Sequence, residues 1–257
     1  MNNISLVAKT EPALREAGRL FLKSAPDMET MVKGFANYVT EIDFKVQDYL
    51  VKELSGILPG SNIITEESSQ NQYDLSKPTW ILDPVDGTAN LMRGYRHSAI
   101  SLALVIDKKP ALGMIYNPFL NEMFIGDAGR GAYLNGNRIK VSSASKLEDC
   151  IITFGTTPYI SRDKNTTIKV LDRVFAKCQD LRRSGSAALD LAYVACGRID
   201  AFFEICLQPW DFAAGLLILE EAGGKITDMT GGKPELIKQG SILASNELVH
   251  EDLLGLF

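Results

Sequence analysis

The order of the apolar segments changes near Cys150, and this change limits the fold classes open to the chain. Before Cys150, two segments with helical periodicity, residues 11–23 and 42–57, precede a series of short strand-like runs. After it, strand-like and helical segments alternate, which is typical of an α/β arrangement. The sequence therefore predicts a mixed α+β and α/β fold, with an α+β half over residues 1–150 and an α/β half over residues 151–257.

The first half is expected to lay its helices on a largely antiparallel sheet, with the second helix stopped by Pro59-Gly60. Its predicted strands cover residues 63–64, 80–82, 98–106 and 111–116, followed by a hairpin of 132–133 and 139–141. The second half has predicted strands at 151–154 and 199–204 and helices at 166–178, 187–196, 211–222 and after 246. No linker rich in Pro, Gly or Ser separates the halves, so we expect one compact unit with a small-molecule site in the crevice between them.

The composition argues against several kinds of partner. The 257 residues are 46% hydrophobic and carry 27 basic and 32 acidic side chains, without a basic stretch interleaved with aromatics, so nucleic acid is not expected as the main partner. The longest apolar segment, residues 99–106, is too short to span a bilayer, and no secretion signal is expected at the N-terminus. The four cysteines show no CxxC spacing and are interpreted as reduced thiols of a cytoplasmic protein.

Two aspartates three residues apart, Asp83 and Asp86, follow an apolar run in the segment WILDPVDGTAN. Pro84 disfavours the α region for the residue before it, so Asp83 is expected at the carboxyl end of an extended strand. Gly87 permits a sharp turn, and amides at the start of a following helix can bind an anion. The segment thus offers carboxylates and anion donors side by side, although the local pattern also fits an ordinary Asp-Gly turn.

Further acidic groups stand at the ends of apolar segments. Glu66 and Glu67 end a short strand in ITEES, and Asp211 opens an apolar helix in PWDFAAG. Each alone is typical of a solvated loop or a helix N-cap. Together with Asp83, and without a set of His or Cys ligands, they suit a hard cation such as Mg²⁺ rather than zinc.

Other site chemistries are not supported by the sequence. It contains no GxxxxGK[ST] phosphate loop, GxSxG elbow, HExxH or GxGxxG segment. The two histidines, His97 and His250, stand in contexts that pair neither with a nucleophile, so we expect them to be structural or solvent-facing. Covalent catalysis by Ser or Cys is therefore not predicted.

Taken together, WILDPVDGTAN, PWDFAAG and ITEES resemble the three motifs of the inositol monophosphatase family, the Mg²⁺-dependent, lithium-sensitive phosphatases of sugars and inositols. The resemblance runs from about residue 40 to residue 224. It implies the layered αβαβα sandwich shared with fructose-1,6-bisphosphatase, a cofactor of two or three Mg²⁺ ions, inhibition by Li⁺, and a homodimer.

The resemblance also implies roles for individual residues. The metal ligands would be Glu66, Asp83, the carbonyl of Val85, Asp86 and Asp211. Asp43 and Thr88 would orient the attacking water, with Glu66 holding the activating ion, and Gly87 and Thr88 would hold the phosphate. Contacts to the substrate hydroxyls would come from Gly185, Ser186, Ala187 and Glu204.

Some positions depart from the family pattern or carry no assigned role. Leu91 stands where the family commonly has Phe, and Arg96 stands roughly where Pro is common, which leaves specificity at the pocket mouth open. Lys33 is spaced loosely for a phosphate contact, and Arg182 and Arg183 fit a phosphate clamp, a dimer contact or a salt bridge.

The resulting hypothesis is Mg²⁺-dependent hydrolysis of a phosphate monoester by metal-activated water. Myo-inositol monophosphate is the expected substrate. The alternatives are a fructose-1,6-bisphosphatase, a broad sugar phosphatase and a 3′-phosphoadenosine 5′-phosphate phosphatase. From a different class, a non-catalytic binding protein is disfavoured because the acidic set is complete.

Overall fold

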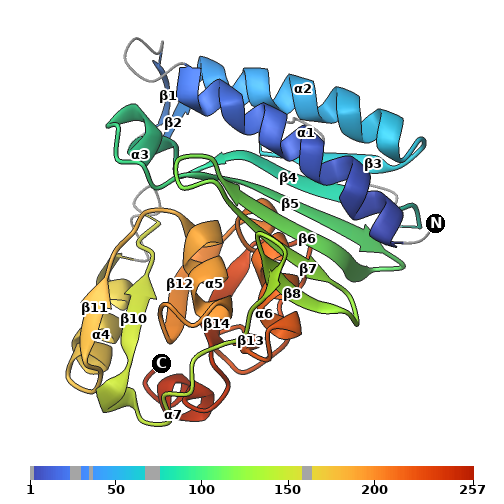
Figure 1. Cartoon of the computed structure of the whole chain (residues 1–257). Coiled ribbons are helices and arrows are strands. Elements are labelled where there is room, and N and C mark those ends of the chain that lie inside the picture. The colour runs from blue at the N-terminus through green and yellow to red at the C-terminus, as the bar shows by residue number, and fades with distance from the viewer. Residues whose placement is uncertain (1–2, 24–29, 35–36, 67–75, 158–163) are drawn as a thin grey trace.

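A computed structural model describes residues 3–23, 30–34, 37–66, 76–157 and 164–257 of the chain. These residues form five layers (Figure 1): two helices, a seven-stranded sheet, two further helices, a five-stranded sheet, and outer helices. The predicted αβαβα sandwich is therefore confirmed. In the described part of the chain, no helix combines the length and the apolar character needed to cross a membrane.

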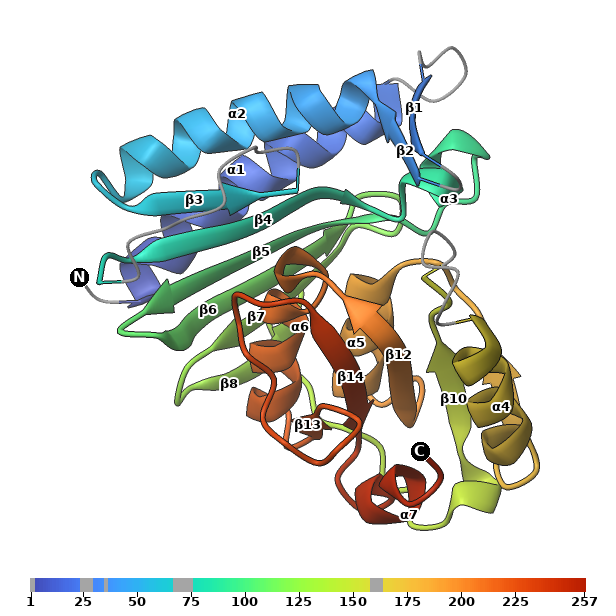
Figure 2. The same cartoon turned by 180° about the vertical axis from the view of Figure 1, so that it is seen from behind.

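Helices α1 (Asn3–Lys23) and α2 (Glu41–Ile57) cover the outer face of the large sheet (Figures 1 and 2). The apolar face of α2 is formed by Val46, Leu50 and Leu54, which are fully buried against the sheet. Thr40 begins α2 through a capping box, since its hydroxyl accepts from the Ile42 amide and its amide donates to the Asp43 carboxylate at 2.8 Å. The second helix ends before Pro59 as predicted, whereas the first begins eight residues earlier than the predicted residue 11.

The large sheet has the strand order β3 to β9, with β3 parallel to β4 and every other pair antiparallel. Its strands are β3 (Asn62–Thr65), β4 (Thr79–Asp86), β5 (Ala99–Ile106), β6 (Lys109–Asn117), β7 (Glu122–Asp127), β8 (Gly131–Leu134) and β9 (Asn137–Arg138). The predicted hairpin is confirmed, but its second arm lies at residues 137–138 and not at 139–141, although the Ile139 amide still donates to the Ala132 carbonyl oxygen at 2.9 Å. Asn135 and Gly136 make the turn with positive φ, so the second arm starts directly at Asn137 and has ended before Val141, whose amide bonds to Ala222.

The smaller sheet has the order β11-β10-β12-β14-β13, in which β10 is parallel to both neighbours and β14 is antiparallel to both of its own. Its strands are β10 (Ile151–Phe154), β11 (Asp180–Arg182), β12 (Ala201–Leu207), β13 (Lys225–Thr227) and β14 (Gly240–Ser245). The outer helices of this half are α4 (Lys164–Phe175) and α7 (His250–Leu254). The remaining short elements are β1 (Thr30–Gly34), β2 (Asn37–Thr40), α3 (Thr88–Met92) and a 3-10 turn at Leu147–Asp149.

The central layer consists of α5 (Ala187–Ala195) and α6 (Pro209–Glu221), which are buried between the two sheets (Figure 2). Four small residues stand in register across the strands under α6: Ala103, Gly113, Gly126 and Ala132. A Cβ at Gly113 would lie 2.5 Å from the Ala214 carbonyl oxygen, and one at Gly126 would lie 2.8 Å from the Cα of Ile218. The lack of a side chain at Gly113 and Gly126 thus sets how closely α6 approaches the sheet, and with it the position of Asp211 in the first turn of α6.

Candidate active site

The carboxyl end of β4 delivers two buried carboxylates. Asp83 and Asp86 are 2% and 7% exposed, and the pairing of β4 with β5 shifts register between them. Pro84, which has no amide hydrogen to donate to β5, lies within this irregularity. Because the irregular pairing accommodates Pro84, the strand continues to Asp86, whereas the sequence predicted that it ends at Asp83. The amide of Val85 donates to Asp83 Oδ1 at 2.9 Å and fixes that carboxylate.

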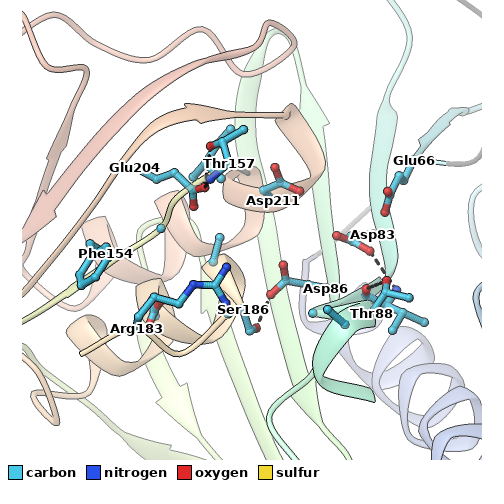
Figure 3. A pocket seen from close by; sticks show the side chains of 18 residues that line it. Glu66, Asp83, Asp86, Thr88, Phe154, Thr157, Arg183, Ser186, Glu204 and Asp211 are labelled. Carbon is cyan, nitrogen blue, oxygen red and sulfur yellow. Dashed lines mark hydrogen bonds between the residues drawn. The ribbon is translucent and has the colours of Figure 1, made fainter. Parts of the chain in front are cut away.

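A third carboxylate comes from the central layer. Asp211 stands in the first turn of α6, where its Oδ2 accepts from the Gln208 amide at 2.7 Å. Asp83, Asp86 and Asp211 each offer an oxygen, and these oxygens all lie within 4.8 Å of one another. Glu66 follows β3, which is parallel to β4, so it reaches the same edge of the sheet and lines the same cavity of about 180 Å³ (Figure 3).

The carboxyl groups of this cluster have raised pKa values, because burial and mutual repulsion disfavour their ionised forms. Burial raises the pKa of Asp83 well above its usual range, and the neighbouring Glu66, Asp86 and Asp211 raise it further. Burial likewise raises the pKa of Asp211, with Asp86 as the next cause. Burial raises the pKa of Asp86 to about 6, although hydrogen bonds from Ser186 and Ala188 oppose the shift. A divalent cation would relieve this repulsion, and a set of carboxylate oxygens without His or Cys fits Mg²⁺.

A hydroxyl–carboxylate pair lies beside the cluster. Thr88, the first residue of α3, places its Oγ1 3.2 Å from Asp43 Oδ1 and 3.0 Å from the Val85 carbonyl oxygen. The other oxygen of Asp43 accepts from the amide and the hydroxyl of Thr40 at 2.8 and 2.5 Å. Gly87 precedes α3 with φ 89°, and a Cβ there would lie 3.1 Å from the His97 carbonyl oxygen, so this tight turn requires glycine.

The second half of the chain closes the cavity from the other side. Gly185, Ser186 and Ala187, which lead into α5, all line it. The Ser186 hydroxyl donates to Asp86 Oδ2, and the Ala188 amide donates to the same oxygen at 3.0 Å. Ser186 was predicted to contact the substrate; in the structure its hydroxyl is engaged with a metal-ligand candidate.

Glu204 stands on β12 at the far wall of the cavity. Its Oε1 accepts from the amide and the hydroxyl of Thr157 at 3.0 and 2.7 Å, and burial raises its pKa to about 7. Gly155 leaves the space for this carboxylate, because a Cβ at that position would overlap it.

Several cavity residues were not predicted from the sequence, among them Phe154, Gly155, Thr157 and Asp190. A signal for the first three exists, since Phe154 ends β10 and the other two follow it, and the carboxyl end of β10 lies beside that of the parallel strand β12. The signal for Asp190 is a charged residue inside the otherwise apolar helix AALDLAYVA.

The other residues considered from the sequence take varied places. Arg183 lines the cavity, with Nη2 3.3 Å from Thr156 Oγ1, whereas Arg182 pairs with Asp180 at the surface. His250 is fully buried between the hydroxyls of Thr227 and Ser245 and is structural as predicted. The cysteines, Cys150, Cys178, Cys196 and Cys206, are free thiols. Glu67 and the side chain of Lys33 lie outside the described residues.

Fold and site together define a class, the αβαβα phosphatases with a carboxylate-rich site between two sheets. A match to the inositol monophosphatase family spans residues 3–257. The Nus factor SuhB of Escherichia coli (strain K12) is 41% identical over 247 residues, which cover 95% of this chain and 92% of that protein. The inositol-1-monophosphatase of Mesorhizobium japonicum is 39% identical over 246 residues, 94% of this chain and 92% of that protein.

The structural comparison agrees with the sequence match. The crystal structure of the extragenic suppressor protein suhB from Bartonella henselae superposes with a TM-score of 0.92 at 37% identity, covering 98% of this chain and 97% of that one. The chain therefore belongs to the inositol monophosphatase family, a family of Mg²⁺-dependent phosphatases acting on small phosphorylated substrates.

Proposed function

We propose that the protein hydrolyses a phosphate monoester with Mg²⁺ as cofactor, and that myo-inositol monophosphate, converted to inositol and phosphate, is its preferred substrate. The observation that carries the proposal is the arrangement of Asp83, Asp86 and Asp211 around one cavity, with the Thr88–Asp43 pair beside them. Glu66 and the carbonyl of Val85 would complete the ligand set.

The size of the barrier explains why a carboxylate cluster is needed. Enzymes accelerate phosphate monoester hydrolysis by up to about 10²¹-fold, whereas a general base alone contributes roughly 10²–10⁴-fold. Mg²⁺ held by these carboxylates would supply a further part of the acceleration by neutralising phosphate charge and making a water molecule more acidic.

The chain's own contribution to the attack is orientation and proton handling. Thr88 has one hydroxyl proton for its two acceptors, Asp43 and the Val85 carbonyl, and its two lone pairs can accept a hydrogen bond from a water molecule. Asp43 is itself fixed by two donors from Thr40. The pair would therefore hold the attacking water, whose proton would pass to Thr88 Oγ1 as Thr88 gives its own proton to Asp43 Oδ1.

The far wall of the cavity would select the leaving group. The Glu204 carboxylate, held by Thr157, can accept hydrogen bonds from substrate hydroxyls, and Gly185 and Ala187 flank the same space. Together with the Gly87 turn and Thr88 for the phosphate, this favours a polyol monophosphate. Arg183 on the same wall favours instead a second anionic group, as in fructose 1,6-bisphosphate or 3′-phosphoadenosine 5′-phosphate.

The proposal is tested by phosphate release with Mg²⁺ on myo-inositol 1-phosphate, fructose 1,6-bisphosphate and 3′-phosphoadenosine 5′-phosphate in parallel, each with and without Li⁺. A lithium-sensitive preference for inositol phosphate supports it. Comparable rates on the first two substrates would indicate a broad sugar phosphatase. No release from folded protein would refute hydrolysis of these substrates.

A second candidate function comes from the E. coli relative, which bears the name Nus factor. We therefore also consider a binding role for this chain. Folded protein that releases no phosphate from the three substrates and binds no Mg²⁺ in titration calorimetry would favour that role over hydrolysis. On the family resemblance we further propose a homodimer, which light scattering would refute by returning a monomer mass.

The four free cysteines support a cytoplasmic location.

A further inference from the structure

Asp190 is a buried acid that the proposed chemistry does not use. It stands in α5 among apolar residues, is 2% exposed, and forms no ion pair with any residue in the described ranges. Burial raises its pKa well above the usual range, and the nearby Asp86 and Glu204 raise it further. Leu has a similar size and would bury no charge here, so the acid is unfavourable for the fold alone.

One oxygen of Asp190 has a specific partner. The Ser184 hydroxyl donates to Asp190 Oδ2 at 2.7 Å, while Oδ1 meets no close hydrogen-bond partner among the described residues, and Thr153 lowers the pKa of Asp190 as a further donor. Asp190 also lines the cavity. The same hydroxyl stands 3.4 Å from the Ser186 carbonyl oxygen, a weaker acceptor. Asp190 therefore decides where the single proton of Ser184 points.

The direction of that proton affects the turn before α5. With its proton on Asp190, Ser184 Oγ presents a lone pair to the Ser186 amide, which donates to it at 3.2 Å. The Ser186 hydroxyl then donates to Asp86 Oδ2, where the Ala188 amide also donates at 3.0 Å. Both donors occupy one oxygen of Asp86, so the other, Oδ1, is left for a cation.

We propose that Asp190 is a positioning residue for the candidate metal centre: by holding the Ser184 hydroxyl it fixes the turn of Ser184 to Ser186 and so the orientation of the Asp86 carboxylate. The inference rests on the proposed function, in that Asp86 is taken as a metal ligand. Partners that orient a ligand in this way typically change metal affinity by about 10–100-fold when removed.

The test measures Mg²⁺ affinity by titration calorimetry on the purified chain after chelation, independently of turnover. Asp190→Leu and Ser184→Ala should each weaken Mg²⁺ binding by about 10–100-fold. Asp190→Asn should remain within about threefold of wild type, because its amide oxygen accepts the same hydrogen bond although the charge is gone. Equal losses in Asp190→Asn and Asp190→Leu, with none in Ser184→Ala, would mean a long-range charge effect and would overturn the inference.

A double variant tests whether the two residues act in series. The variant that combines Asp190→Leu with Ser184→Ala should bind Mg²⁺ about as tightly as the single variant with the lower Mg²⁺ affinity. If the two losses of affinity instead multiply, the residues act independently and the inference fails. Ser142→Ala is the matched control. It removes another Ser–Asp hydrogen bond, from Ser142 Oγ to Asp200 Oδ1 at 2.5 Å, away from the cavity, and should leave Mg²⁺ affinity unchanged.

The remaining outcomes separate this inference from the proposed function. If wild type binds no Mg²⁺, the metal centre and the inference fall together. If wild type binds and Ser184→Ala binds equally well, only the inference falls. Thermal unfolding in chelator checks that each variant is folded; should Asp190→Leu not fold, Ser184→Ala and Asp190→Asn decide the matter.

Discussion

At the scale of single residues, the buried charge of Asp83 lowers the stability of the fold but is expected to be needed for cation binding. Its carboxylate is buried beside Glu66, Asp86 and Asp211, all acidic, and this raises its pKa. Asp83→Asn keeps the oxygen that accepts from the Val85 amide and removes the charge. We expect phosphate release to fall more than about 100-fold, while the free energy of unfolding in chelator stays equal or rises. A variant with unchanged kcat would contradict the ligand assignment.

His250 provides a second residue-scale prediction, for pH. Both ring nitrogens contact hydroxyls in a fully buried site, and burial lowers the pKa to about 4, against about 6.5 in an unfolded chain. Because the folded-state pKa is depressed, the fold favours neutral imidazole, so this stability is present above pH 6.5 and is lost as pH falls towards 4. Between pH 7 and 5 the loss should be roughly 1–2 kcal/mol.

His250→Gln isolates this contribution from the carboxylates that titrate in the same range. The variant will be less stable than wild type at pH 7, and the difference should shrink by roughly 1–2 kcal/mol at pH 5. Urea unfolding at both pH values measures it. A difference that is independent of pH would mean that folding does not shift the pKa of His250.

How far the site could be predicted depended on where each residue's partners lie in the sequence. Asp83, Asp86 and Asp211 stand in segments whose local pattern places them at element ends, and the structure brings them together. Asp190 stands out in the sequence only as a charge in an apolar helix, and its place at the cavity depends on the packing of α5 between two sheets, which no local pattern gives. The bond from Ser186 to Asp86 joins residues 100 positions apart, which no local pattern encodes.

At the scale of elements, the row of small residues under α6 fixes the position of Asp211. Gly113→Ala would place a Cβ against the Ala214 backbone, which cannot move without shifting the helix. We expect a loss of about 1–3 kcal/mol in the free energy of unfolding, measured in urea, and a weaker Mg²⁺ affinity. Gly56→Ala is the matched control. Its Cβ meets nothing within 4 Å in α2, so it should stabilise by up to about 1 kcal/mol. Equal stability of the two variants would contradict the role of the row.

Several strands were missed from the sequence, and the shortest of them share a physical reason. β11 and β13 are three residues long and are held as strands only by pairing with β10 and β14, so neither has a periodicity of its own. The long helices were predicted because α2 and α6 carry enough apolar positions to reveal their period or their burial. The helices were therefore predicted more completely than the strands, since the six-residue strands β7 and β14, which lie inside their sheets, were missed as well.

At the scale of the whole molecule, the candidate site lies where the layers meet. β4 contributes Asp83 and Asp86 from the large sheet, α6 contributes Asp211 from the central layer, and α5 presents Ser186 to Asp86 (Figure 3). A cation bound there would be lost whenever these layers separate. Its binding free energy should therefore appear as stability of the entire fold rather than of one loop.

Removing and restoring the metal tests this coupling. Mg²⁺ at about 100 times its Kd should add roughly 2.7 kcal/mol, which for a chain of this length raises Tm by about 5–10 °C over the protein in chelator. Asp83→Asn should begin with an equal or higher Tm in chelator, because mutual repulsion of the acids is reduced, and should gain little from Mg²⁺. The two melting curves are then expected to cross as Mg²⁺ is added. If Mg²⁺ raised the Tm of wild type no more than that of Asp83→Asn, the acidic cluster would not be the site of the ion. The destabilising repulsion among its carboxylates would then need another explanation.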